Sequence, residues 1–256
     1  MQNNTFPTLF VGHNLIRLSS VGSTNDFLKM MLSNSEPLLE GTVIMADNQF
    51  AGRGQYSSSW QSEPGSNLTF SIFLKPGFLP LEKQFLLNMA VCVGINEVLC
   101  KLTPSGFSVK WPNDVYYQDR KVGGVLIENG VSERIISYSI VGIGINVNQQ
   151  NFDGPGLAKA GSIGKILQQH VDLQDLLRQI CGGIEAEYLK LKAGRQQDLH
   201  ERYLSILYRR GITAQYEDKT GAFEGQITRV DERGVMFVKR EGKDYEYRVK
   251  EIEFLP

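Results

Sequence analysis

The apolar positions of the chain recur with two different periods, which predict strands in some segments and helices in others. Five runs have the composition of strands: residues 42–46, 68–74, 107–110, 122–128 and 135–146. Between residues 81 and 102, apolar side chains such as Phe85, Met89 and Val93 return at the spacing of one helix face. Residues 171–208 have helical composition, and Ser23 has the chemistry of an N-cap for a short helix.

The last part of the chain has a different pattern. Short strand-like runs alternate there with turns, at residues 212–215, 223–227, 235–238 and 245–249. This pattern predicts a small β-barrel at residues 211–256, after an α+β core at residues 1–210. The short turns within residues 107–146 favour antiparallel pairing, and the polar residues 47–67 form a long connection of the kind that is usually functional or disordered.

Composition narrows the class of protein. The 256 residues are 41% hydrophobic, which is enough for a large core. The 27 Lys and Arg are balanced by 28 Asp and Glu, so the composition predicts no cationic surface for nucleic acid. The N-terminus lacks a signal-peptide pattern and no apolar stretch is expected to span a bilayer, so the predicted location is the cytoplasm, with no membrane partner. The three cysteines and three histidines are scattered, which predicts neither disulfides nor a zinc site.

The candidate chemistry is concentrated in residues 110–124. Lys110-Trp111-Pro112-Asn113-Asp114 offers a cation, an amide and a carboxylate, which could meet a metal ion and a phosphate oxygen together. Lys121, followed by Gly123 and Gly124, could neutralise an anion that lies against the backbone. The rival interpretations are an ordinary Asn-Asp turn, a solvated lysine and a β-bulge.

A second cluster, Gly52-Arg53-Gly54-Gln55, lies between Gln49 and Trp60 and is a candidate lid. By itself this motif also describes any flexible loop. The run from Gly142 to Asn146 alternates glycine with apolar residues, as a closely packed core strand does, and Asn146 could bond a ligand at its end. The chain has neither a Gly-x-x-x-x-Gly-Lys-Ser/Thr phosphate loop nor a Gly-x-Gly-x-x-Gly fingerprint, so any ATP site is of another kind.

Together, and in this order, these motifs resemble those of biotin protein ligase, also called biotin-[acetyl-CoA-carboxylase] ligase. The resemblance implies a catalytic domain like that of class II aminoacyl-tRNA synthetases, with a mixed sheet and flanking helices, followed by an SH3-like domain. It implies ATP and biotin as substrates, Mg²⁺ as cofactor, and transfer of biotin through biotinyl-5'-AMP to a lysine of a biotin carboxyl carrier protein. The 22 residues before Ser23 are too few for a helix-turn-helix domain, so the monofunctional type without DNA binding is expected.

The resemblance also implies roles for individual residues. Those for the catalytic step are Lys121, Asp114 and Arg53. Those for biotin are Ser23, Thr24, Asn25, Gln49, Gly52, Arg53, Gly54, Gln55, Lys121, Gly123 and Gly124. Those for ATP are Arg53, Trp60, Lys110, Asn113, Lys121 and Asn146, with Asn113 and Asp114 near the metal.

One departure from the family pattern concerns the loop. Many members have Gly-Arg-Gly-Arg followed by further basic residues, whereas this chain has Gln55 and then Tyr-Ser-Ser-Ser. Two other functions stay open: a lipoate- or octanoate-protein ligase, and a non-catalytic biotin-binding protein on the same fold. A homodimer formed through an exposed sheet edge is also open.

Overall fold

The structure is a computed structural model that describes residues 6–33, 37–55, 58–153, 157 and 159–256. Its main sheet contains seven strands: β1 (Leu15–Val21), β2 (Val43–Gln49), β5 (Leu68–Leu74), β6 (Phe107–Lys110), β7 (Asp114–Tyr117), β8 (Arg120–Ser132) and β9 (Ile135–Ile145). Their order is β1-β2-β5-β9-β8-β7-β6. Among the described strands of this sheet, only β1 and β2 pair in parallel, and the antiparallel pairing predicted for the strands between 107 and 146 is confirmed.

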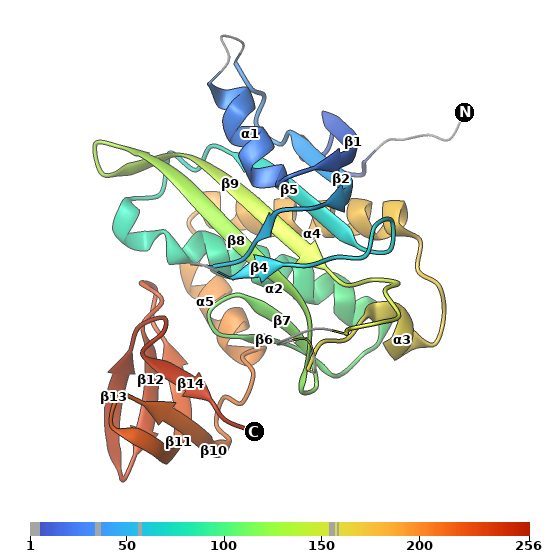
Figure 1. The fold of residues 1–256 in the computed structure, drawn as a ribbon. Helices are drawn as coiled ribbons and strands as arrows, with labels where there is room; N and C mark the ends of the chain where they lie inside the picture. Colours follow the sequence, from blue (N-terminus) through green and yellow to red (C-terminus); the bar gives the residue numbers. More distant parts are fainter. Residues whose placement is uncertain (1–5, 34–36, 56–57, 154–156, 158) are drawn as a thin grey trace.

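The helices lie on both faces of this sheet (Figure 1). They are α1 (Thr24–Leu32), the 3₁₀ turn η1 (Leu81–Lys83), α2 (Phe85–Leu102), α3 (Ile163–Leu167), α4 (Leu173–Lys192) and α5 (Gln196–Ser205). On β5 the side chains alternate: Phe70 and Ile72 belong to the core shared with α2 and α4, while Phe73 packs with Leu28 of α1. Because successive strand residues face opposite sides, Ser71 is on the α1 side.

Helix α2 is the central core helix. Residues 81–102 are long and apolar enough to cross a membrane, so the expectation that no such stretch exists was wrong on length and composition. However, 67% of its 18-residue apolar window is buried within the fold, as the core helix of a globular protein is. Gly94 of α2 meets Gly183 of α4, where an added Cβ would lie 2.7 Å from the Gly183 carbonyl oxygen. Glycines that lower helix propensity therefore let the two helix backbones touch.

The C-terminal part is a five-stranded antiparallel sheet. It consists of β10 (Thr213–Asp218), β11 (Gly221–Val230), β12 (Met236–Arg240), β13 (Lys243–Tyr247) and β14 (Ile252–Phe254), in the order β13-β12-β11-β10-β14. It contacts the core where the Trp111 indole donates to the Gly234 carbonyl at 3.0 Å and where Lys83 pairs with Glu232 at 3.2 Å. The predicted α+β class with a small C-terminal β module is confirmed; the division at residues 210 and 211 falls between α5 and β10 and stays a prediction.

Candidate active site

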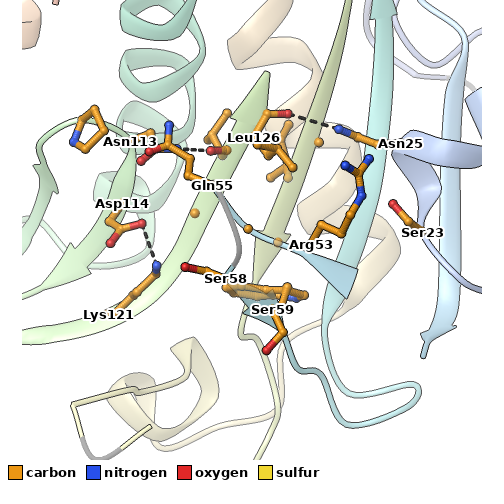
Figure 2. Close-up of a pocket in the computed structure, with 18 of the residues that line it drawn as sticks. Ser23, Asn25, Arg53, Gln55, Ser58, Ser59, Asn113, Asp114, Lys121 and Leu126 are labelled. Atoms are coloured by element: carbon orange, nitrogen blue, oxygen red, sulfur yellow. Dashed lines mark hydrogen bonds and ion pairs between the residues drawn. The ribbon is translucent and has the colours of Figure 1, made fainter. Parts of the chain in front are cut away.

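A cavity of about 280 Å³ lies on the α1 side of the main sheet. It is lined by residues 23–25, 49, 53–55, 58–60, 112–114, 121, 124–126, 142–144 and 249–250. The predicted loop supplies one wall as a hairpin of β3 (Gly52–Arg53) and β4 (Ser59–Trp60). In Figure 2, Asn25 and Arg53 lie at one end of the cavity and Asp114 and Lys121 at the other, with Gln55 and Ser58 between them.

The first end is built of hydroxyl and amide groups. Ser23 caps α1 by accepting from the Asp26 amide at 3.4 Å, which presents Thr24 and Asn25 at the start of the helix. Gln49 accepts from the Thr24 amide at 2.9 Å, and the buried Ser71 hydroxyl lies 2.7 Å from Thr24 Oγ1. Since Asn25 Oδ1 can only accept, Ser71 donates to it at 2.6 Å. This network fixes the donors and acceptors that a neutral polar ligand would meet.

The second end is charged. Asp114 begins β7, opposite Gly124 of β8, and its carboxylate pairs with the Lys121 ammonium at 2.7 Å. Asn113 is buried and its amide donates to the Val125 carbonyl, so that the turn before β7 is tied to β8. Lys121 and Asp114 retain 37% and 27% side-chain exposure, which leaves both accessible to a ligand in the cavity.

The floor between the two ends is strand β9, where glycines leave room for other side chains. A Cβ at Gly142 would clash with Asn25 Oδ1, and one at Gly144 would clash with the Trp60 ring. The alternation of glycine with apolar residues therefore reflects close packing, as predicted, but on the cavity side it accommodates two side chains of the site. The Trp60 Nε1 is buried without a hydrogen-bond partner among the described residues.

Arg53 points toward the first end rather than toward Lys121 (Figure 2). Its guanidinium lies 2.6 Å from Asp26 Oδ1 and 3.0 Å from Glu128 Oε2. Burial alone would raise the pKa of Glu128, but hydrogen bonds from Lys29 and Asn25 and the charge of Arg53 outweigh it and lower the pKa. Glu128 is therefore ionised at neutral pH.

Comparisons with known proteins identify the family of the chain. Residues 18–146 match the model of the "Biotin/lipoate A/B protein ligase family", which is half of the chain. The chain belongs to this family. A structure of the biotin protein ligase from Aquifex aeolicus in complex with biotin and ATP is 30% identical, with a TM-score of 0.79, over 94% of this chain and 98% of that one.

Curated relatives agree with that structure. The bifunctional ligase/repressor BirA of Bacillus spizizenii is 29% identical over 234 residues, which are 91% of this chain and 71% of the relative. A biotin-[acetyl-CoA-carboxylase] ligase of Mycobacterium tuberculosis is 28% identical over 136 residues, 52% of this chain and 48% of the relative. The predicted family is confirmed, and so is the prediction that the chain is an enzyme of the ligase class.

The cavity of this biotin/lipoate ligase family member brings together most of the predicted site residues. Those that line it are Ser23, Thr24, Asn25, Gln49, Arg53, Gly54, Gln55, Trp60, Asn113, Asp114, Lys121 and Gly124. The hairpin residues 56 and 57 lie outside the described residues. The roles of the individual residues stay predictions.

Four predicted site residues do not line the cavity. Gly52 packs against Trp60 and Gln49, and Gly123 against Ile145. Asn146 is buried and donates to the Gly161 carbonyl at 3.1 Å.

Lys110, the fourth, lies in a separate pocket with its ammonium 4.7 Å from the centre of the Phe254 ring. Burial lowers the pKa of Lys110, an effect that the neighbouring Asp114 opposes.

The structure adds site residues that sequence reasoning missed. Ser71, Asp26 and Glu128 bond to predicted site residues, and Val249 and Lys250 of the C-terminal module line the cavity. Ser71 had one usable signal, because it is a polar residue on the alternate face of an apolar strand. Nothing in the sequence connects residues 249 and 250 to a cavity formed by residues 23–144.

The predicted metal position is compatible with an ion that ATP brings. Among the described residues, no three His, Cys, Asp or Glu side chains cluster as a metal site. Asp114 carries the only carboxylate among the described lining residues. Since Mg²⁺ is usually bound by one or two carboxylates together with substrate phosphates, Asp114 suits a nucleotide-borne ion, while the Asn113 amide already bonds to Val125.

Proposed function

We propose that this chain attaches biotin to a lysine of a biotin carboxyl carrier protein, with ATP as the second substrate and biotinyl-5'-AMP as the intermediate. The observation that carries the proposal is the polarity of the cavity. A hydroxyl and amide network lies at one end, where the Arg53 cation is already paired with two carboxylates, while the Lys121 cation lies at the other end and the β3–β4 hairpin lies beside both. That arrangement suits a ligand with a neutral polar head and a carboxylate tail. The likeness to a ligase structure that holds biotin and ATP supports the same assignment.

The first chemical step forms a bond between the biotin carboxylate and the α-phosphorus of ATP and expels pyrophosphate. Lys121 is a cation at the charged end and is paired there with Asp114, so we assign to it the binding of the carboxylate and the α-phosphate. A phosphate oxygen then replaces Asp114 as the partner of Lys121. Catalysis comes from positioning the two anions and from neutralising the charge that develops between them.

We assign the nucleotide to the region of Trp60. The indole offers an apolar face and an Nε1 donor that has no partner among the described residues, and a buried donor without a partner is costly unless a ligand satisfies it. Mg²⁺ bound to the phosphates would supply further positive charge at the transferred group. Asp114 is the residue that would meet that ion.

In the second step, the carrier lysine attacks the carbonyl carbon of the mixed anhydride, forms an amide and releases AMP. The attacking amine must be neutral, and Asp114 is the group at this end that could accept its proton. The β3–β4 hairpin would keep water away from the anhydride until the carrier arrives.

The location of the enzyme and its macromolecular partners are also part of the proposal. We place it in the cytoplasm, with no nucleic-acid partner. For a homodimer, the candidate interface is the β1 edge of the sheet. The β6 edge is already occupied by the chain near Leu207, where the Val109 amide donates to the Ile206 carbonyl at 2.8 Å.

The direct test of the first step is biotin-dependent pyrophosphate exchange. Purified protein is incubated with ATP, labelled pyrophosphate and either biotin or lipoate, and the label that enters ATP is counted. Exchange with biotin but not lipoate is expected. Exchange with lipoate alone would make the chain a lipoate ligase, whereas biotin binding without any exchange would make it a non-catalytic biotin-binding protein.

A further inference from the structure

The β3–β4 hairpin is held to the rest of the protein by charges that the proposed chemistry does not use. The Arg53 guanidinium bonds Asp26 of α1 at 2.6 Å and Glu128 of β8 at 3.0 Å. These are the ion pairs that connect the described hairpin residues to the body of the core. The other described bonds of this segment lie at its base, where Phe50 and Ala51 donate to Val21 and Gly22, or within the hairpin itself.

Glu128 is the centre of this arrangement. Its carboxylate also accepts from the Asn25 amide at 2.7 Å and from the Lys29 ammonium at 2.6 Å. Ser71 bonds Asn25 Oδ1, and Asn25 Nδ2 donates to Glu128 and, at 3.4 Å, to the Leu126 carbonyl, so Glu128 makes the shortest of the bonds that orient the amide nitrogen. One carboxylate thus contacts both the polar end of the cavity and the hairpin beside it.

The hairpin position matters for the cavity because Trp60 depends on it. Gly52 of β3 pairs with Trp60 of β4, so the two strands move as one unit. The Trp60 ring lies on Gly144, where no Cβ intervenes. Release of Arg53 would leave Asp26 and Glu128 with Lys29 as the remaining cation and would leave the hairpin without its ion pairs to the core.

We propose that Asp26 and Glu128 are positioning residues which, through Arg53, clasp the β3–β4 hairpin over the cavity and link its closure to the orientation of Asn25. In this clasp (Arg53, Asp26 and Glu128), Arg53 acts on the hairpin rather than on a phosphate. The clasp itself is a property of the unliganded chain. Its effect on biotin rests on the proposed function.

The clasp is tested first without any ligand. The chain has two tryptophans, and Trp111 is only 4% exposed, so acrylamide quenching reports mainly on Trp60. Glu128→Gln and Asp26→Asn keep side-chain size but remove the charge, and each should raise the quenching constant about twofold. The matched control is Asp47→Asn, which breaks a similar exposed pair with Arg17 at 2.8 Å outside the cavity lining and should leave quenching unchanged.

A double-mutant cycle then assigns the effect to the pair. Arg53→Gln and Glu128→Gln should each increase quenching, but the double variant should add little to Arg53→Gln, because that change already removes the bond to Glu128 together with the bond to Asp26. Additive increases would overturn the clasp, and so would unchanged quenching in both carboxylate variants. Raising the salt concentration to about 1 M should bring wild-type quenching toward that of the variants, since these ion pairs are partly exposed and are screened by salt.

The link to the ligand is measured by the kinetics of biotin binding. In Glu128→Gln the dissociation rate of biotin should rise about threefold to tenfold, while the association rate changes less than about twofold, because a loosened hairpin releases ligand more readily than it blocks entry. A fall in the association rate as large as the rise in the dissociation rate would indicate simple misfolding and overturn the link. Failure of the wild type to bind biotin would contradict the proposed function, while the quenching result would still decide the clasp.

Discussion

Two of the cations that line the cavity are ion-paired before a ligand arrives, Arg53 with Asp26 and Glu128, and Lys121 with Asp114. In the proposed reaction, a phosphate would therefore compete with a carboxylate for Lys121, whereas Arg53 is turned to the other end. Sequence reasoning named Arg53, Lys121 and Asp114 as site residues, and the structure places all three in the lining of one cavity, while their roles stay predictions. It could not assign their partners, because Glu128 and Asp26 carry no signal that distinguishes them from ordinary surface carboxylates.

Replacement of Lys121 by alanine should affect chemistry more than folding. The ion pair is partly exposed, so its loss should cost at most about 1 kcal/mol in the free energy of unfolding. Loss of a cation at a transferred phosphoryl group typically lowers the rate about 100-fold or more. Pyrophosphate exchange and urea unfolding measure the two effects, and a variant that unfolds readily but exchanges normally would contradict the assignment of Lys121.

Replacement of Gln55 by arginine should strengthen the hold on an anionic intermediate. Gln55 lines the cavity between Arg53 and Lys121, and Figure 2 shows it on the side of Asn113 and Asp114. An added cation there should slow the release of biotinyl-5'-AMP about threefold to tenfold, with an effect that weakens at high salt. Gln55→Met is the uncharged control, and equal release rates in both variants would count against a phosphate at this end.

At the scale of elements, the glycine pattern of strand β9 correctly predicted close packing. The structure shows which side chains the cavity-side glycines accommodate, namely Asn25 and Trp60. The apolar runs of β5, β8 and β9 are long and were predicted from composition. Strand β1 was missed because Arg17, Ser19 and Ser20 interrupt its apolar pattern, and β7 was missed because it begins at Asp114, within an Asn-Asp pair that is typical of a turn. The β3–β4 hairpin was predicted as a lid but not as paired strands, since each strand has only two residues.

Substitutions at Gly142 and Gly144 of β9 should each weaken the binding of a different substrate. An alanine at Gly144 would displace Trp60, and an alanine at Gly142 would displace Asn25. We expect Gly144→Ala to raise KM for ATP about tenfold with less effect on biotin, and Gly142→Ala to do the reverse. Steady-state kinetics with each substrate varied in turn measure both. Equal effects of both variants on both substrates would mean that the strand is merely distorted.

At the scale of the whole molecule, the C-terminal module is part of the site as well as an attachment to the core. Val249 and Lys250 line the cavity, although they are more than one hundred residues from its other walls. Sequence reasoning separated this module correctly as a β unit from its alternating pattern. It could not predict the docking, because the contact depends on how two surfaces fit and no local pattern encodes that.

The Trp111 indole should contribute to this docking. Trp111→Phe keeps most of the buried ring but removes the bond to the Gly234 carbonyl, which would cost about 1–2 kcal/mol in the free energy of unfolding if that carbonyl stays unsatisfied. Urea unfolding measures the change. Trp60→Phe is the matched control, since Trp60 Nε1 has no partner among the described residues, and it should cost less. A larger loss in the control would contradict the role given to Trp111.

The most direct measurement of the central claim is ATP-dependent transfer of labelled biotin to a biotin carboxyl carrier domain, with excess lipoate as competitor. The carrier variant that lacks the acceptor lysine serves as the blank, and Lys121→Ala serves as the enzyme control. The account predicts label on the carrier that needs ATP and the acceptor lysine, ignores lipoate and falls about 100-fold in the Lys121 variant. Absence of label in an enzyme that binds biotin, or transfer that lipoate abolishes, would contradict it.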